Sequence, residues 1–230
     1  MDQSLALCRS LLEEGIGCVV ATPHQLGRFD GSNDAANVRE TVSQLNGRLT
    51  DAGIALKVVP GGEVRVDERI CELLKADKVL TIADAGRYIL LELPHDVFID
   101  IEPLLRDLDS MGVRAILSHP EKSASLLGNQ QVLRGWLDRG VRLQVTASSL
   151  AGALGPQIEK VAWGLLGSGW ANIVATDAHD VGLKRPEMRA AFKRISTRLG
   201  VKVATLFCID NPSRVVAGQD VVAYRQEVHR

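Results

Sequence analysis

The chain has 230 residues, of which 46% are hydrophobic and 24% are charged, and its formal net charge is −1. This composition is typical of a soluble globular protein and excludes disordered, collagen-like and coiled-coil chains. The near-neutral charge and the aromatic content of only 4% argue against binding to nucleic acid or to an anionic membrane surface.

The length fits a single domain over residues 1–230, because one hydrophobic core can serve about 250 residues before chains divide into domains. No apolar run approaches the ~20 residues that cross a membrane, and residues 1–14 lack a signal-peptide layout. We therefore expect a cytoplasmic protein without membrane insertion. The four cysteines form no CxxC pair, so the sequence indicates neither a disulfide framework nor a zinc knuckle.

Amphipathic stretches typical of helices alternate with short, continuously apolar runs typical of strands that are buried on both faces. Such an alternation predicts a parallel sheet covered by helices. In chain order the sequence predicts helix 5–14, strand 18–22, helix 35–52, strand 56–59, helix 67–75, strand 88–93, helix 101–111, strand 114–118, helix 132–139, strand 143–146, helix 156–166, strand 172–176, helix 186–199 and strand 204–209.

Glycines mark the ends of the predicted helices. Glycine is the usual helix-terminating residue in a loop that leads to a strand. No GxGxxG follows the first strand, which argues against a dinucleotide-binding fold. Seven strands with intervening helices therefore predict an α/β fold of the TIM-like barrel type, open or distorted. The glycines concerned are Gly15, Gly53, Gly112, Gly140, Gly169 and Gly200.

Imidazole and carboxyl groups follow the C-terminal ends of the predicted strands. In a parallel barrel these ends share one face, which carries the chemistry. The candidate residues are His24, Glu63, Glu92, His119, Asp177 and His179. Taken singly, each has an ordinary structural alternative, such as a helix cap or an ion pair. Their shared position favours a common site, whereas His95 beyond a proline and His229 in the tail are predicted to be loop and solvated residues.

This donor set suits Mn, Fe, Zn or Mg, and no thiolate biases it toward zinc. One metal needs about four protein ligands, so six candidates indicate two or more metals bridged by carboxylates. Such a cluster holds a hydroxide at neutral pH and binds both oxygens of a phosphoryl displacement. The residues therefore favour metal-dependent hydrolysis, in particular of a phosphate ester.

Six segments carry a more specific pattern: residues 21–24 (ATPH), 60–63 (PGGE), 88–92 (YILLE), 118–121 (SHPE), 144–150 (QVTASSL) and 175–179 (ATDAH). In order and spacing they resemble the bacterial metal-dependent protein-tyrosine phosphatases of the CpsB/YwqE type, in the PHP (polymerase and histidinol phosphatase) superfamily. The resemblance runs from about residue 5 to residue 218 and includes the closing segment 211–214 (NPSR).

The resemblance implies a distorted (β/α)7 barrel with two or three metal ions, usually manganese, for which the six residues above would be ligands. It implies hydrolysis of phosphotyrosine on the tail of an autophosphorylating bacterial tyrosine kinase that controls capsule or exopolysaccharide synthesis. Arg28 would lie near the phosphate, Lys122 after the HPE motif would supply a cation, and Asp177 would also serve catalysis. An oligomer is compatible with this interpretation.

Two departures from the family pattern affect this expectation. Lys122 stands where the family usually has arginine, and a lysine cannot bind phosphate through a bidentate fork. The family also begins with a strand carrying Asp-x-His-x-His, and nothing of that kind precedes Leu5. We therefore expect a chain that is N-terminally truncated relative to the family and lacks the first barrel strand. Its strand 18–22 would have an open edge, and its phosphatase activity would be weak.

Residues 208–214 also match Cys-x5-Arg, the minimal loop of cysteine-based phosphatases. Asp210 would place negative charge in that loop, and the glycine that lets the backbone turn is absent. We favour a structural interpretation, with Cys208 in a buried strand followed by a helix that begins at Asn211-Pro212.

Three functions remain open from the sequence. The first is a metal-dependent phosphotyrosine phosphatase. The second is a degenerate, weakly active relative that acts by binding a kinase or another partner, as the missing first motif suggests. The third is another PHP phosphoesterase, such as a histidinol phosphatase or a polymerase-linked exonuclease. The near-neutral charge argues against the exonuclease, and segment 144–150 favours the tyrosine phosphatases by resemblance.

Overall fold

The computed structural model describes residues 2–182 and 186–224 and has the predicted α/β architecture with parallel strands. A two-stranded sheet has the order β1-β3, and a six-stranded sheet has the order β2-β4-β5-β6-β7-β8. The strands are β1 (Cys18–Ala21), β2 (His24–Gln25), β3 (Lys57–Pro60), β4 (Glu63–Arg65), β5 (Tyr88–Glu92), β6 (Arg114–Ser118), β7 (Arg142–Thr146) and β8 (Ala171–Ala175).

Two segments of the chain contribute a strand to each sheet. β1 leads into β2 and β3 leads into β4, and the breaks fall at Pro23 and at residues 61–62. Glycine is required at the second break, because a Cβ added to Gly62 would lie 2.1 Å from the side-chain oxygen of Gln25. That oxygen accepts a hydrogen bond from the Leu80 amide at 2.9 Å, so Gln25 ties the break to the following chain.

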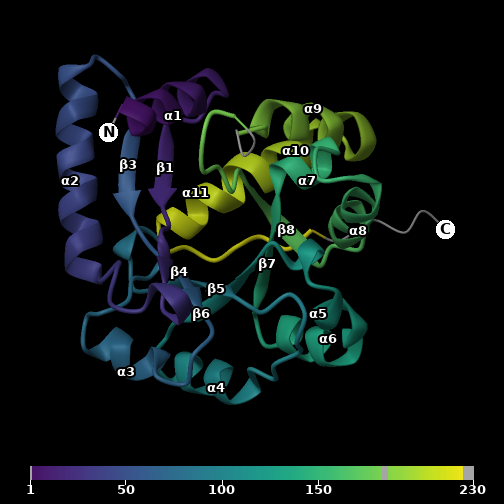
Figure 1. The fold of residues 1–230 in the computed structure, drawn as a ribbon. Helices are drawn as coiled ribbons and strands as arrows, with labels where there is room; N and C mark the ends of the chain where they lie inside the picture. Colours follow the sequence, from purple (N-terminus) through teal and green to yellow (C-terminus); the bar gives the residue numbers. More distant parts are fainter. Residues whose placement is uncertain (1, 183–185, 225–230) are drawn as a thin grey trace.

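Helices lie around the strands, with α2 outside β1 and β3, and with α3 and α4 below the six-stranded sheet in Figure 1. None of the helices in the described ranges is both long enough and apolar enough to cross a membrane. The helices are α1 (Asp2–Glu13), α2 (Ala35–Asp51), α3 (Ile70–Lys75), α4 (Glu102–Ser110), α5 (Ala124–Gly128), α6 (Gln130–Asp138), α7 (Ala147–Ala151), α8 (Pro156–Gly167), α9 (Met188–Leu199), α10 (Val201–Thr205) and α11 (Asn211–Val216).

Local sequence explains where these elements begin and end. The Asp34 side chain caps α2 by accepting a hydrogen bond from the Asn37 amide at 2.9 Å. Gly140, which follows α6, has a φ of 104°, a left-handed value that residues with a side chain rarely adopt. The central strands are buried along nearly their whole length, as expected for a parallel sheet covered on both faces.

The predicted strand at 204–209 is wrong, because this segment is helical. It spans the end of α10 and a π-helical turn, η4 (Leu206–Asp210), which leads directly into α11. The most deeply buried residues of the region are Ala204, Phe207, Asn211 and Val215. They recur every three or four residues, so one helical face packs against the core.

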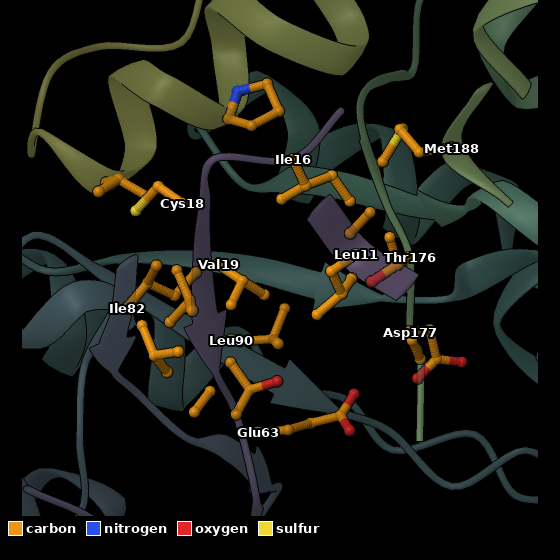
Figure 2. Close-up of a pocket in the computed structure, with 18 of the residues that line it drawn as sticks. Leu11, Ile16, Cys18, Val19, Glu63, Ile82, Leu90, Thr176, Asp177 and Met188 are labelled. Atoms are coloured by element: carbon orange, nitrogen blue, oxygen red, sulfur yellow. The ribbon is translucent and has the colours of Figure 1, made fainter. Parts of the chain in front are cut away.

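The sheets leave an opening between β1 and β8. Among the described residues, β1 pairs only with β3 and β8 pairs only with β7, so the edge expected beside strand 18–22 is open. A cavity of about 1160 Å³ lies between these two strands. Its walls are mainly apolar, and Glu63 and Asp177 lie at one end, as Figure 2 shows.

Candidate active site

The predicted site residues lie at, or one to four residues beyond, the C-terminal ends of β1, β3, β5, β6 and β8. His24 begins β2 and Glu63 begins β4, and the two residues are direct partners in the register of these strands. Glu92 ends β5, His119 follows β6, and residues 177–179 follow β8. Because parallel strands end at one edge, side chains that are far apart in the sequence share one face of the sheet.

Two glutamates connect two histidines at the centre of this face. The Glu63 carboxylate lies 3.1 Å from His24 Nδ1 and 3.3 Å from His119 Nε2. The Glu92 carboxylate lies 3.9 Å and 3.8 Å from the same two nitrogens. Each carboxylate therefore faces both imidazoles, an arrangement suited to bridging metal ions.

Asp177 and His179 extend the group on the side of β8. The His179 and His24 ring centroids lie 6.2 Å apart, and His179 Nδ1 lies 2.9 Å from the Asp177 carbonyl oxygen. The Asp177 carboxylate accepts a hydrogen bond from Lys122 Nζ at 2.7 Å. The structure thus brings all six predicted metal ligands and Lys122 into one connected group.

The central pair is electrostatically coupled. Burial would by itself raise the pKa of Glu63, but hydrogen bonds from His119 and Ser118 and the nearby imidazole charges lower that pKa to about 2. Burial would lower the pKa of His119, yet its contact with Glu63 raises it. The site therefore stabilises a negative charge on Glu63.

The residues fit a metal centre. His24 Nδ1 is buried and makes no hydrogen bond, although the Glu63 carboxylate is only 3.1 Å away. An unpartnered buried nitrogen close to a carboxylate is the arrangement expected of a metal ligand. Ligand atoms of Glu92, His95 and His119 also lie within 4.8 Å of one another. Imidazole nitrogens and carboxylate oxygens suit several divalent ions, so the donor set does not select one metal.

His95 is a site residue that the sequence analysis passed over. It lies in the loop after β5, as expected, but its ring packs edge-on against His119 with the centroids 5.3 Å apart. Burial lowers its pKa, and so does the nearby His119. The sequence offered one signal that His95 belongs to the site, because it is only three residues after Glu92, a predicted ligand. His229, which was predicted to be a solvated residue of the tail, lies outside the described residues.

Arg65 is a second residue that the sequence analysis missed. Its guanidinium lies 3.2 Å from the Glu92 carboxylate, and the two residues are partners in the β4–β5 register. The alternation of strand side chains offered a signal, because Arg65 is two residues beyond Glu63 and shares its face.

Arg28 reaches the site through an aromatic neighbour. Its guanidinium lies over the Phe29 ring at 4.7 Å from the centroid. The Phe29 ring stacks on His24 with the centroids 5.1 Å apart and an angle of 17° between the planes. Phe29 therefore connects the predicted phosphate-binding arginine to the imidazole of a predicted metal ligand.

Glu121 holds the neighbouring turn in place. Its buried Oε1 accepts hydrogen bonds from the Thr146 amide at 2.9 Å and from Ser149 Oγ at 2.7 Å. Both donors belong to the QVTASSL segment, where β7 passes into α7. The observed contacts of this oxygen therefore position the turn, whereas Glu121 Oε2 is buried without a hydrogen-bond partner.

Two site residues have strained backbones. His119 has a φ of 34° and Asp177 has a φ of 50°, in the left-handed region that residues other than glycine rarely adopt. Such conformations cost roughly 1–3 kcal/mol each and tend to cluster at functional sites. These residues follow β6 and β8, and their side chains contact Glu63 and Lys122 in the site.

The Cys-x5-Arg segment does not form a phosphate-binding loop. Cys208 lies in the π-helical turn η4, and burial raises the pKa of its thiol to about 12. The Arg214 side chain donates a hydrogen bond to the Asp220 carbonyl at 3.4 Å. The favoured interpretation was wrong about a strand at Cys208 but right about a helix beginning at Asn211.

Comparison with known proteins supports the resemblance to tyrosine phosphatases that the site residues indicate. The solved structures of YwqE from Bacillus subtilis and CpsB from Streptococcus pneumoniae, described as unique metal-dependent tyrosine phosphatases, include a chain that matches with a TM-score of 0.92. That match has 29% sequence identity and covers 100% of this chain and 92% of the other.

Sequence relatives agree with the structural match. The tyrosine-protein phosphatase YwqE of Bacillus subtilis is 34% identical over 179 residues, which cover 77% of this chain and 70% of YwqE. The tyrosine-protein phosphatase CpsB of Streptococcus pneumoniae is 24% identical over 225 residues, which cover 95% of this chain and 91% of CpsB. The family described as "Capsular polysaccharide synthesis, CpsB/CapC" matches residues 1–217. The chain therefore belongs to the CpsB/CapC family.

Proposed function

We propose that this protein is a metal-dependent phosphatase that hydrolyses phosphotyrosine in proteins. The main support is the convergence of three histidines and three carboxylates at the C-terminal ends of the strands. The activities named for YwqE and CpsB support the choice of phosphotyrosine over the substrates of other PHP phosphoesterases.

The proposed ligands are His24, Glu63, Glu92, His119, Asp177 and His179. We propose manganese, as two or three ions, with iron, zinc or magnesium as alternatives. Bound ions of this kind supply a Lewis acid for the phosphoryl oxygens and a hydroxide at neutral pH. Glu63 contributes a carboxylate that stays ionised across the physiological pH range, since its pKa is about 2.

Two cations of the chain would stabilise the phosphate. Lys122 is held by Asp177 at 2.7 Å, so its ammonium group is fixed next to the proposed metal ligands. Arg28 is exposed, and its guanidinium lies over the Phe29 ring. From this position the guanidinium could reach the phosphate of a bound substrate. Both cations would offset the charge that develops on the phosphoryl oxygens during hydrolysis.

The proposed substrate is the phosphotyrosine-bearing tail of a bacterial tyrosine kinase, and the proposed pathway is capsule or exopolysaccharide synthesis. The family's description as capsular polysaccharide synthesis proteins supports the pathway. We propose action in the cytoplasm by a single domain over residues 1–230, with a distorted barrel as its framework. Nucleic acid and membranes are not among the proposed partners.

The decisive experiment combines elemental analysis with an activity assay. Freshly purified protein should contain at least one Mn or Fe per chain, and added Mn should raise hydrolysis of a phosphotyrosyl peptide. A chelator should abolish that activity, and a phosphoseryl peptide of the same sequence is the matched control. The proposal fails if hydrolysis persists in the chelator, or if metal-loaded protein releases no phosphate from the phosphotyrosyl peptide.

The opening between β1 and β8 favours a second candidate function. The cavity between these strands is mainly apolar and reaches Glu63 and Asp177, so it offers a binding surface next to the proposed ligands. A protein that binds its phosphorylated partner there without efficient turnover would fit this feature. Metal content below about one ion per chain, together with retained binding of the phosphotyrosyl peptide, would favour this second function.

A further inference from the structure

Arginines gather at the end of the sheet opposite the candidate active site. Arg87 directly precedes β5, Arg114 begins β6, and Arg142 begins β7. β5, β6 and β7 have five residues each, so about 13 Å separates the first and last residues of each strand at a rise of ~3.3 Å per residue. The three arginines therefore lie at the end of the sheet opposite the proposed metal ligands.

Strand register places two of these arginines on the same face. Arg142 is the partner of Ile116, which lies two residues after Arg114 and so shares its face. Ile116 lines the interior cavity, so Arg114 and Arg142 both start from the interior face of adjacent strands. The two arginines are therefore neighbours at the N-terminal ends of β6 and β7.

One carboxylate serves two of the arginines. Asp220 Oδ1 accepts a hydrogen bond from Arg87 at 2.9 Å and another from Arg114 at 2.8 Å. The Asp220 side chain is 66% exposed, whereas the two arginine side chains are 33% and 34% exposed. A single exposed carboxylate oxygen therefore bridges two guanidinium groups that are more buried than it is.

Arg142 has no carboxylate partner within salt-bridge distance among the described residues. Its guanidinium donates to the Val141 carbonyl at 3.1 Å. Burial is the main cause that lowers the pKa of Arg142; the charge of Arg114 also lowers it, whereas Tyr88 and the charge of Asp220 act in the opposite direction. On α4, Glu102 pairs with Arg139 instead, at 2.7 Å.

Three guanidinium groups with one carboxylate leave an excess of two positive charges. A phosphate monoester carries about −1.5 to −2 charges at pH 7, and guanidinium groups bind its oxygens in a bidentate fork. We propose that Arg87, Arg114 and Arg142 form a second phosphate-binding site, for free phosphate or for a phosphoryl group on a larger molecule. The site would hold its ligand at the end of the sheet opposite the catalytic residues.

Isothermal titration of the full chain with inorganic phosphate tests this proposal, after metal has been removed with a chelator. Arg142→Gln should weaken phosphate binding about tenfold, the effect of losing a charge-assisted hydrogen bond. Arg139→Gln removes the same charge at the same end of the sheet and is the matched control, with an expected change of less than about twofold. Equal weakening by both variants would overturn the proposal, because it would indicate only general charge attraction.

Further variants separate the two ends of the sheet. Lys122→Gln should leave the Arg142-dependent binding in place, whereas loss of all phosphate binding in Lys122→Gln would overturn the proposal. Asp220→Asn should tighten phosphate binding, because it removes the carboxylate that competes for Arg87 and Arg114. If Arg142→Gln does not fold, Arg87→Gln replaces it with the same expectations.

A second series replaces inorganic phosphate with a phosphotyrosyl peptide to identify the source of the phosphate group. Weaker peptide binding in Arg142→Gln would assign the site to a phosphorylated protein. If Arg142→Gln affects only inorganic phosphate, the site is assigned to the free ion. If Arg142→Gln changes the binding of neither ligand, the proposal is wrong.

Discussion

The two ends of the same strands differ in charge, burial and backbone strain. Arg87 directly precedes β5, which ends at Glu92, and β6 begins at Arg114 and is followed by the strained His119. Between these ends the strands are apolar and buried. The apolar interior fixes the framework, so each end can carry its own set of charged groups without changing the fold.

The difference in burial predicts a difference in energetics. We call the end of the sheet with the proposed metal ligands the catalytic end, and the end with Arg87, Arg114 and Arg142 the arginine end. The Glu63 side chain at the catalytic end is 7% exposed, whereas the Asp220 side chain at the arginine end is 66% exposed. Charge interactions are strong where water is excluded and weak where solvent screens them. Substitutions at the catalytic end should therefore change chemistry, and substitutions at the arginine end should change stability or phosphate binding by smaller amounts.

Glu63→Gln should have the largest effect. The substitution removes the carboxylate that faces both His24 and His119. We expect loss of bound metal and a fall in kcat/KM of about 10³-fold, because metal polarisation is worth several kcal/mol and each ~1.4 kcal/mol is tenfold. Elemental analysis and steady-state kinetics measure both effects. Glu102→Gln on α4 is the control, and a Glu63→Gln enzyme with normal metal content would contradict the expectation.

Lys122→Ala should have the next largest effect, a fall in kcat/KM of roughly 10²-fold, as for the loss of one electrostatic donor to the transition state. Lys122→Arg keeps the positive charge and can bind phosphate through a planar bidentate fork. Its kcat/KM for a phosphotyrosyl peptide should stay within about tenfold of the natural protein. Equal losses in both variants would show that Lys122 acts through its contact with Asp177 and not through charge.

Gly62→Ala should lower the free energy of unfolding by about 1–3 kcal/mol, the usual cost of overpacking. The added Cβ would lie 2.1 Å from the Gln25 side-chain oxygen, next to Glu63. Gly47→Ala in α2 is the control, since nothing lies within 4 Å of its added Cβ and alanine favours a helix. Urea unfolding of both variants checks the prediction, which fails if Gly62→Ala is as stable as Gly47→Ala.

Tyr88→Phe should reduce stability by about 1 kcal/mol, the net value of a lost hydrogen bond. The Tyr88 hydroxyl donates to the Gln219 carbonyl at 3.1 Å and accepts from the Val221 amide at 3.4 Å, holding residues 219–221 across the arginine end. Thermal unfolding measures the loss. The kcat/KM should not change, and a tenfold fall would show that the two ends are coupled.

Cys208→Ser should have the smallest effect on activity, a change of less than about twofold, as for a substitution away from the reacting groups. The thiol is protonated at neutral pH because burial raises its pKa to about 12. Phosphotyrosine hydrolysis with and without a chelator measures this variant. Loss of activity in Cys208→Ser together with resistance to the chelator would indicate a cysteine mechanism.

The positions of the six predicted ligands could be inferred from sequence because two simple regularities suffice. Apolar runs such as 114–118 identify buried parallel strands, and parallel strands end on one side of a sheet. His119 and Asp177 are therefore brought together by topology alone, although 57 residues separate them in the sequence. The strands in the structure match the predicted runs to within one or two residues for six of the seven predictions.

The other features depend on three-dimensional contacts that local patterns do not specify. Residues 204–209 are too short and too apolar to separate a strand from a buried helix, and only the burial of Asn211 and Val215 further along reveals the helical period. His95 joins the site because its loop folds back onto His119. The extensions β2 and β4 have only two and three residues, fewer than a sequence pattern can define.

The left-handed backbone at His119 and Asp177 has a consequence for how this protein can change over evolution. Native proteins are stable by only about 5–15 kcal/mol, so two strained residues at roughly 1–3 kcal/mol each use a notable share of that margin. Glycine at either position would relieve the strain but remove a functional side chain. The catalytic end is thus a place where stability and activity oppose each other, and a drift toward greater thermal resistance would tend to erase the chemistry first.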